Sequence, residues 1–231
     1  MSRTVIWIAL FSWIIGLSIR QQASRPVLPD RRTQELQLLR EQAPRLKEGD
    51  LVLRLSRDPL SQLIRVFNKI DPSYSHAGLV VYREGRPMVL HAVSGDENPV
   101  GGIITVPLDV FANPQENHGF ALYRYSLKPA EVARLSDTLL SWERSRIGFD
   151  SLFSLRSNDL MYCSELVMKA IRVATGNRIL VEPVVLEAWQ KKVLAAHLGQ
   201  AFPEGRLAIV PIDRLYRNPF CSEILRVGFS D

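Results

Sequence analysis

Ser75-His76-Ala77-Gly78-Leu79 is one of two short segments that decide the fold of this chain, and Tyr162-Cys163-Ser164-Glu165-Leu166 is the other. The first puts an imidazole at the start of an apolar strand, and the second puts a thiol in the first turn of a predicted helix. A thiol and an imidazole on rigid elements are the minimum set for nucleophilic chemistry by sulfur. We therefore predict that Cys163 and His76 meet in the folded chain.

A second histidine, His91, lies on the strand that returns from the first segment. Residues 75–82 and 87–94 form a predicted β-hairpin around Glu84-Gly85. A loop of two or four residues places His91 opposite Gly78, so that His76 and His91 become diagonal neighbours on one face. One imidazole can then act as base for Cys163 while the other orients it, as in a catalytic triad. A loop of three or five residues would put the two rings on opposite faces and remove this role.

The thiol of Cys163 begins the predicted helix over residues 163–175, which ends at Gly176-Asn177, a left-handed cap. Unpaired N–H groups and the helix dipole at this end favour a thiolate. The same helical face carries Val167, Ala170 and Ala174, so the thiol points toward the sheet. The alternative is that Cys163 is a small buried apolar residue without chemistry.

The remaining pattern predicts an α+β domain with a mainly antiparallel sheet packed against helices. A helix begins at Asp58-Pro59, a cap followed by proline at the first helical position, and another begins at Pro129. Helices are also expected within 34–41 and 186–197. Further strands are predicted over residues 51–55, 102–106, 120–125, 207–210 and 223–227.

The N-terminal segment is directed at a membrane. Residues 5–19 are uncharged and apolar; as a helix they would rise roughly 22 Å, short of the hydrocarbon thickness of about 30 Å. Residues 1–20 are therefore expected to be a signal peptide or a signal anchor, residues 21–47 a basic connector, and residues 48–231 the domain. We expect an uncleaved anchor with a periplasmic domain, although arginines on both sides of the segment leave its orientation open.

Composition narrows the possible partners. The chain has 231 residues and a net charge of +5, but it lacks a basic patch interleaved with aromatic residues, so no nucleic-acid partner is expected. A basic stretch that faces anionic lipid accounts for the charge. The two cysteines, Cys163 and Cys221, are too few for a disulfide framework, although they could pair with each other. The oligomeric state is left open.

No cofactor or metal is expected. The spacing of His, Cys and Asp does not match a zinc or iron site, and no glycine-rich phosphate loop is present. Ser164 lacks the flanking glycines of a serine-hydrolase elbow. Asp50 and Asp150 are interpreted as turn-forming residues, His118 as a loop residue and His197 as an exposed helix residue.

At these segments the chain resembles the YiiX/YaeF group of permuted papain-like enzymes, within the NlpC/P60 superfamily that also contains lecithin:retinol acyltransferase-like proteins. The resemblance rests on Gly49-Asp50-Leu51-Val52-Leu53, Ser75-His76-Ala77-Gly78-Leu79-Val80, Val89-Leu90-His91-Ala92, Gly148-Phe149-Asp150-Ser151-Leu152-Phe153 and Tyr162-Cys163-Ser164-Glu165-Leu166. The order, histidine before cysteine, is the reverse of that in papain-type enzymes. The resemblance implies a circularly permuted papain-like fold, with Cys163 as nucleophile and His76 as base. His91 takes the place where many relatives carry another polar residue, often Glu.

Three functional hypotheses follow. The first is a membrane-anchored cysteine amidase or peptidase that hydrolyses amide bonds, with cell-wall peptides as candidate substrates. The second is a lipid-directed acyltransferase or thioesterase, which a long apolar groove beside Cys163 would favour. The third is a catalytically inactive binding domain of the same fold.

Overall fold

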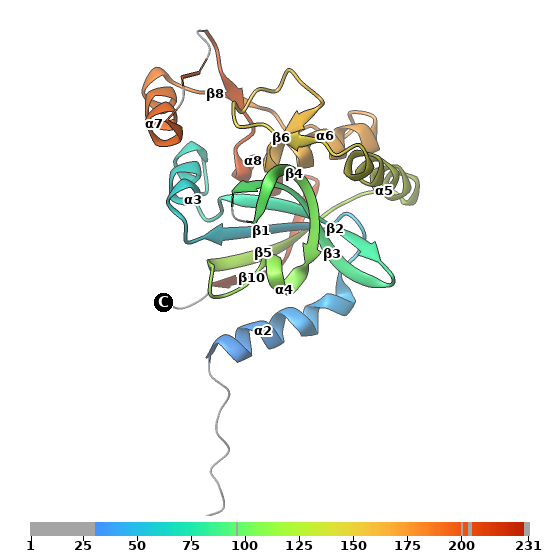
Figure 1. The fold of residues 1–231 in the computed structure, drawn as a ribbon. Helices are drawn as coiled ribbons and strands as arrows, with labels where there is room; N and C mark the ends of the chain where they lie inside the picture. The colour runs from blue at the N-terminus through green and yellow to red at the C-terminus, as the bar shows by residue number, and fades with distance from the viewer. Residues whose placement is uncertain (1–30, 96, 200, 203–204, 229–231) are drawn as a thin grey trace, which may run out of the picture.

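The computed structural model describes residues 31–95, 97–199, 201–202 and 205–228. Its centre is a six-stranded sheet in which every neighbouring pair is antiparallel, in the order β10-β5-β1-β2-β3-β4 (Figure 1). The strands are β1 (Leu51–Ser56), β2 (His76–Arg83), β3 (Arg86–Gly95), β4 (Asn98–Pro107), β5 (Asn117–Tyr125) and β10 (Cys221–Gly228). The expected α+β fold with a mainly antiparallel sheet is confirmed.

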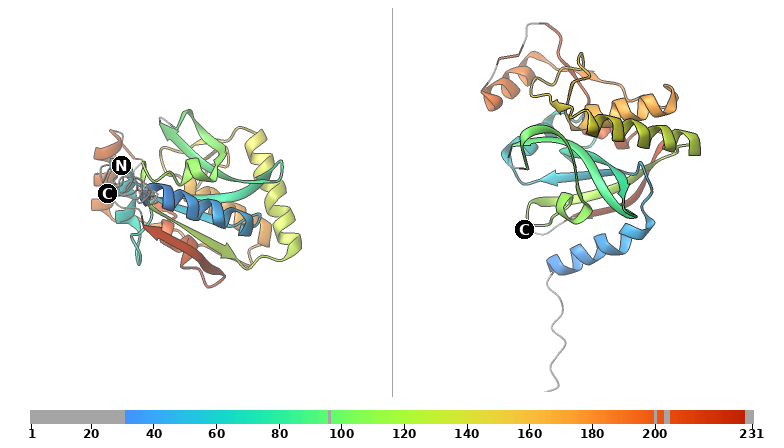
Figure 2. Two further views of the ribbon diagram at one scale, coloured as in Figure 1. Left: turned by 90° about the horizontal axis from the view of Figure 1, so that it is seen from below. Right: turned by 45° about the vertical axis from the view of Figure 1, so that its right-hand side comes forward.

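Helices cover both faces of the sheet, and this explains why the strands have nearly continuous apolar sequences. On one face α5 (Pro129–Arg144) and α6 (Cys163–Thr175) lie side by side (Figure 2). On the other face are α2 (Arg31–Gln42) and α4 (Leu108–Phe111). Alternate residues of one strand therefore enter different cores: Leu51 and Leu53 join the cluster under α6, whereas Val52 joins the cluster that contains Phe111.

The β2–β3 hairpin has the two-residue loop that the histidine argument needs. Glu84 and Gly85 both have positive φ, 51° and 76°, as a tight hairpin turn requires. The register pairs Leu79 with Leu90, which continues to Gly78 opposite His91. A Cβ on Gly78 would lie 2.5 Å from Val89 Cγ1 and 3.2 Å from His91 Cβ, so only glycine fits there. The prediction that both histidines share one face is confirmed.

The helix α6 begins at Cys163 and ends at Thr175, as predicted. Tyr162 caps its start, where the Tyr162 N–H donates to Glu165 Oε2 at 3.3 Å, and Gly176 ends it in the left-handed region with φ 57°. Val167, Ala170 and Ala174 are fully buried against the sheet. This packing fixes the position of the first turn, and with it the position of the thiol.

The other predicted elements form with shifted ends. Asp58 accepts a 2.8 Å hydrogen bond from Ser61 N and caps α3 (Pro59–Ile64), which continues as η2 (Arg65–Phe67). The late helix is α7 (Ala188–Leu198), and β9 (Ala208–Ile209) follows it. The short elements η1 (Ala43–Arg45), β6 (Gly148–Phe149), β7 (Leu160–Met161), β8 (Val184–Val185) and α8 (Ile212–Tyr216) were not predicted. Each of these elements has too few residues to show a hydrophobic period, and for this reason the sequence did not predict them.

The interpretation of His118 as a loop residue is wrong. β5 begins at Asn117, because Asn117 pairs with Ser56 of β1 after a register shift and its side chain donates to the Asn113 carbonyl at 2.8 Å. The polar sequence before Phe120 hides this extension.

The segment expected as a connector contributes to packing. Leu39 of α2 is 1% exposed and joins the core cluster of Phe111 and Phe120. The expected anchor, residues 1–20, lies outside the described residues, and the boundary at residue 48 stays a prediction. None of the helices in the described part of the chain is long and apolar enough to cross a membrane.

Candidate active site

Cys163 lies half-buried at the first position of α6, where the backbone N–H groups of Ala77 and Ser164 and its own N–H lie near the sulfur. Burial raises the pKa of the Cys163 thiol, whereas the N–H groups of Ala77, Ser164 and Cys163 and the charge of Arg54 lower it. Burial is the largest of these effects, so the resting state is a neutral thiol. Cys163 and Cys221 are both free, so the alternative of a disulfide between them does not hold.

His76 and His91 form a hydrogen-bonded pair. His76 Nε2 lies 2.8 Å from His91 Nδ1, and the two rings are nearly perpendicular, with centroids 5.1 Å apart. Burial lowers the pKa of both rings, and the nearby charge of Arg54 lowers it further. The pKa of His91 falls to about 3, so this ring stays neutral in any neutral buffer.

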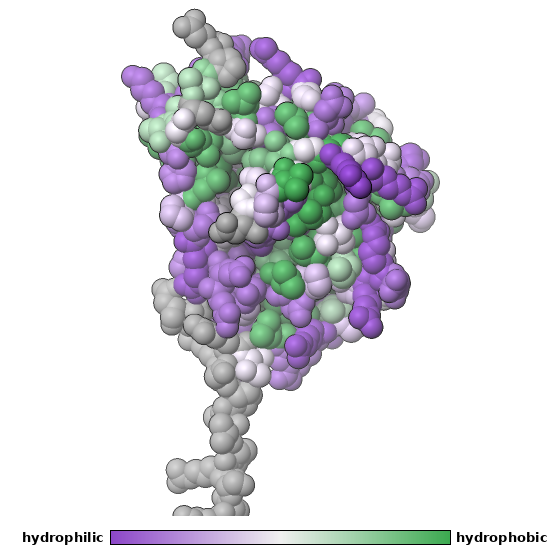
Figure 3. Space-filling view, viewed as in Figure 1, coloured by the Kyte–Doolittle hydropathy of each residue, from purple (hydrophilic) through white to green (hydrophobic). Residues whose placement is uncertain are grey.

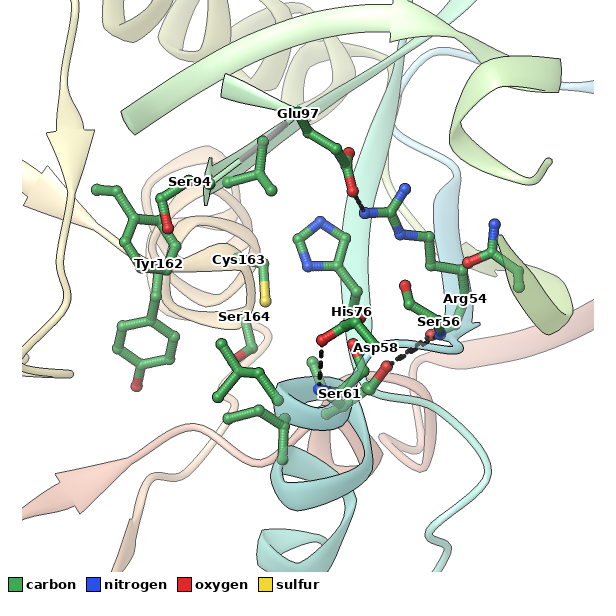
Figure 4. Close-up of a pocket in the computed structure, with 18 of the residues that line it drawn as sticks. Arg54, Ser56, Asp58, Ser61, His76, Ser94, Glu97, Tyr162, Cys163 and Ser164 are labelled. Atoms are coloured by element: carbon green, nitrogen blue, oxygen red, sulfur yellow. Dashed lines mark hydrogen bonds and ion pairs between the residues drawn. The ribbon is translucent and has the colours of Figure 1, made fainter. Parts of the chain in front are cut away.

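The pairing decides which nitrogen of His76 is available for chemistry. Because Nε2 is bound to His91, Nδ1 is the nitrogen that remains for a proton from Cys163. In Figure 4 the His76 ring and the Cys163 sulfur face each other in the pocket. Once His76 carries two protons, its Nε2–H can donate to Nδ1 of neutral His91.

The site forms where two elements begin. His76 is the first residue of β2 and Cys163 is the first residue of α6, and α6 packs against β2. The sulfur lies close enough to the Ala77 N–H for that group to lower its pKa. Residues far apart in sequence are therefore brought to one end of the sheet.

Arg54, Phe111 and Glu97 surround the histidine pair, and sequence reasoning missed all three. The Phe111 ring lies 5.1 Å from the His91 ring and 5.6 Å from the His76 ring, and the Arg54 guanidinium lies 4.7 Å from the Phe111 centroid. Arg54 also forms an ion pair with Glu97. A charged residue inside the apolar sequence Leu51-Val52-Leu53-Arg54-Leu55 was the available signal.

The pocket that contains Cys163 and His76 has a volume of about 810 Å³ and mainly apolar walls. Its walls come from α3, from the β6 region and from the β9–α8 region, and include Leu60, Ile64, Phe149, Phe153, Ile209 and Ile212. Apolar side chains also gather around β4 and β6 on the face of the molecule seen in Figure 3. Such a pocket is suited to an apolar group of a ligand.

Asp50, Asp150 and His197, three further titratable residues that the sequence singled out, lie outside the Cys163–His76 pair. Asp50 pairs with Arg124 at 2.6 Å and accepts the Lys47 N–H at 2.8 Å, and Asp150 accepts the N–H groups of Leu152 and Ser154. His197 is exposed on α7. These positions agree with the turn-forming and surface roles expected for them.

A model of the family described as permuted papain-like amidase enzyme, YaeF/YiiX, C92 family, matches residues 45–206. The chain belongs to this family. The match includes His76, His91 and Cys163, and the fold class and the permuted order of the two segments agree with it.

Two proteins illustrate the similarity. The uncharacterized protein YiiX of Escherichia coli strain K12 is 29% identical over 133 residues, an alignment that covers 57% of this chain and 60% of YiiX. A crystal structure described as metalloprotein yiiX from Escherichia coli O157:H7 has a TM-score of 0.63 and 23% identity. That comparison covers 79% of this chain and 98% of the other chain, and it shows a common fold.

Proposed function

We propose that this protein is a cysteine hydrolase that cleaves amide bonds, with Cys163 as nucleophile, His76 as general base and acid, and His91 as the residue that orients His76. One observation carries the proposal: His91 holds Nε2 of His76 at 2.8 Å, while the same ring faces the sulfur at the start of α6. Nucleophile, base and orienting group are the three parts that such catalysis requires.

In the proposed reaction, the Cys163 thiol gives its proton to His76 Nδ1 while the sulfur attacks the carbonyl carbon. The oxyanion accepts a hydrogen bond from the Cys163 N–H, a contribution typically worth about 10²–10³ in rate for one donor. His76 then protonates the amine nitrogen, the carbon–nitrogen bond breaks and a thioester remains. Water attacks the thioester and gives a proton to His76, which returns it to sulfur as the carboxylic acid leaves.

The electrostatics favour proton transfer during attack over a preformed ion pair. Burial and Arg54 lower the pKa of His76, and burial raises the pKa of Cys163, so the neutral pair is stable at rest. The hydrogen bond from protonated His76 to neutral His91 stabilises the charge that develops.

Attachment to a membrane and a role on cell-wall peptides extend the proposal. The apolar residues 5–19 support a membrane anchor, and the family of papain-like amidases supports amide substrates. An anchor raises the local concentration of the domain near envelope substrates.

A lipid-directed acyltransferase or thioesterase is the second candidate, and the pocket favours it. About 810 Å³ of mainly apolar space beside Cys163 can hold an acyl chain, and the same thioester chemistry would apply. An acyl chain in this pocket is also compatible with an amide substrate, so the two candidates differ in the bond cleaved and in the acceptor.

The Escherichia coli structure is described as a metalloprotein, whereas the described residues of this chain do not form a metal site. Within the described ranges no group of three or more His, Cys, Asp or Glu side chains is arranged to hold one, and the two facing histidine nitrogens bind each other. The proposed steps use groups of the protein and water alone.

Turnover by the full-length protein on murein peptides, N-acyl amino acids and phospholipids tests the proposal. Cys163→Ala should abolish hydrolysis of every substrate that the wild type cleaves. Cys221→Ala is the matched control: burial raises the pKa of Cys221 to about 12 and the residue lies on β10, outside the pocket lining, so turnover should stay unchanged. Unchanged turnover in Cys163→Ala would refute the assignment of the nucleophile.

A further inference from the structure

Arg54 is a buried cation inside the pocket whose hydrogen-bonding capacity is only partly used. The residue is 4% exposed, and its side chain donates from Nη1 to the Phe111 carbonyl at 3.1 Å and from Nη2 to Glu97. Its Nε is buried and has no hydrogen-bond partner within the described part of the chain. A carboxylate can engage the Nε–Nη2 edge of an arginine with both oxygens.

Glu97 engages only one of the two nitrogens on the Nε–Nη2 edge of Arg54. Its carboxylate bonds Nη2 alone, and it comes from the turn between β3 and β4, next to an irregularity in their register. The Glu97 side chain is 38% exposed, whereas the Arg54 side chain is 5% exposed. Glu97 can therefore return to water at low cost, but Arg54 cannot.

The register places Arg54 beside the catalytic histidine. Arg54 of β1 is the direct partner of His76 of β2, and residues paired in this way have Cβ atoms about 4.5–5.5 Å apart. In Figure 4 the Arg54–Glu97 pair and the Cys163 sulfur lie on different sides of the His76 ring. The His76 ring therefore has the nucleophile on one side and the cation on the other, and all three residues line one pocket.

We propose that Arg54 is an anion subsite that binds a carboxylate on the leaving group of the substrate, and that Glu97 occupies this subsite until the substrate arrives. The inference rests on the proposed roles of Cys163 and His76. The leaving amine must contact His76 to be protonated, so its substituents lie in the pocket that His76 and Arg54 both line. The substrate class is an amide whose amine part carries a carboxylate, such as an N-acyl amino acid or the C-terminal residue of a peptide.

Two alkylating reagents test the subsite without any turnover. N-iodoacetylglycine and N-iodoacetylglycinamide have the same reactive carbon and nearly the same size, but only the first carries a carboxylate. The measurement is the ratio of their labelling rates at Cys163 in the full-length Cys221→Ala protein, by intact mass. Glu97→Gln should raise this ratio roughly tenfold to a hundredfold, since a charge-assisted hydrogen bond becomes available to the reagent.

Glu116→Gln is the matched control, because it removes the same charge from an exposed residue at the rim of the same pocket. Its ratio should stay within about twofold of the wild-type ratio, since Coulomb effects of exposed charges are screened. Adding Arg54→Gln to Glu97→Gln should abolish the gain. A ratio in Glu97→Gln no higher than in Glu116→Gln overturns the proposal, even if the Arg54 variant fails to fold. A protein that hydrolyses no amide would contradict the proposed function and still allow this ratio to be measured.

Discussion

Replacing His91 by leucine separates the support of His76 from the stability of the fold. His91 is fully buried, and its polar contact is the 2.8 Å bond to His76 Nε2; its own Nε2 has no partner within the described residues. Leucine has a similar volume and keeps the core apolar. It leaves His76 Nε2 without its partner, which costs about 1–3 kcal/mol, and it removes the unsatisfied His91 Nε2, which recovers about 1–3 kcal/mol. The free energy of unfolding should therefore change by no more than about 2 kcal/mol in either direction.

The reactivity of Cys163 should respond much more strongly. When the thiol proton moves to His76, the bond to His91 becomes charge-assisted and is worth about 1.5–3 kcal/mol. At about 1.4 kcal/mol for each factor of ten, losing it should slow labelling of Cys163 by iodoacetamide roughly tenfold to 150-fold at pH 7. Urea unfolding of the same samples measures the stability.

His91→Asn is the rescue variant. The side-chain amide of asparagine overlies the position of Nδ1 and can accept from His76 Nε2, so labelling should recover to within about tenfold of wild type, although the smaller side chain lowers stability. Labelling of His91→Leu within twofold of wild type, in a protein with unchanged urea unfolding, would show that His91 does not orient His76.

Three further predictions concern packing and protons. Gly78→Ala should lower the free energy of unfolding by about 1–3 kcal/mol in urea, because the new Cβ would lie 2.5 Å from Val89 Cγ1; wild-type stability would contradict this close packing. The iodoacetamide labelling rate of Cys163 should be flat between pH 6 and 8, because His76, whose pKa is lowered by burial, is neutral there and takes the thiol proton during attack. It should rise only above pH 9, because burial raises the pKa of the Cys163 thiol; a rate that rises in proportion to hydroxide from pH 6 to 8 would show that His76 does not take this proton. Glu131→Gln should destabilise the protein by about 1 kcal/mol at pH 7, since Arg178 binds both Glu131 oxygens. These hydrogen bonds from Arg178 are the largest cause that holds the Glu131 pKa at about 2. The contribution of the Glu131 carboxylate to the stability of the wild type is present above the unfolded pKa of 4.5 and is lost as the pH falls toward 2. The stabilities of the two proteins in urea should therefore converge in acid. A difference that stays constant with pH would refute the role of this carboxylate.

Local sequence determined most elements and part of the site. Asp58-Pro59 predicted the start of α3, Gly176 the end of α6, and Glu84-Gly85 the two-residue turn, because each depends on backbone preferences of the residues themselves. From that turn the side-chain period of two was enough to place His76 and His91 on one face. The His-Ala-Gly and Tyr-Cys-Ser-Glu-Leu segments were enough to predict the family and its two main residues.

Only the tertiary structure decided what surrounds those residues. Arg54 becomes part of the site because β1 pairs with β2 in one register, and Phe111 because α4 closes the far face of the sheet. The apolar pocket combines side chains from α3, β6 and α8, which no local period relates to one another. The pKa of His91 falls to about 3 because folding buries it beside a cation; burial and long-range charge are properties of the assembled chain, and a single sequence does not contain them until its strands are paired.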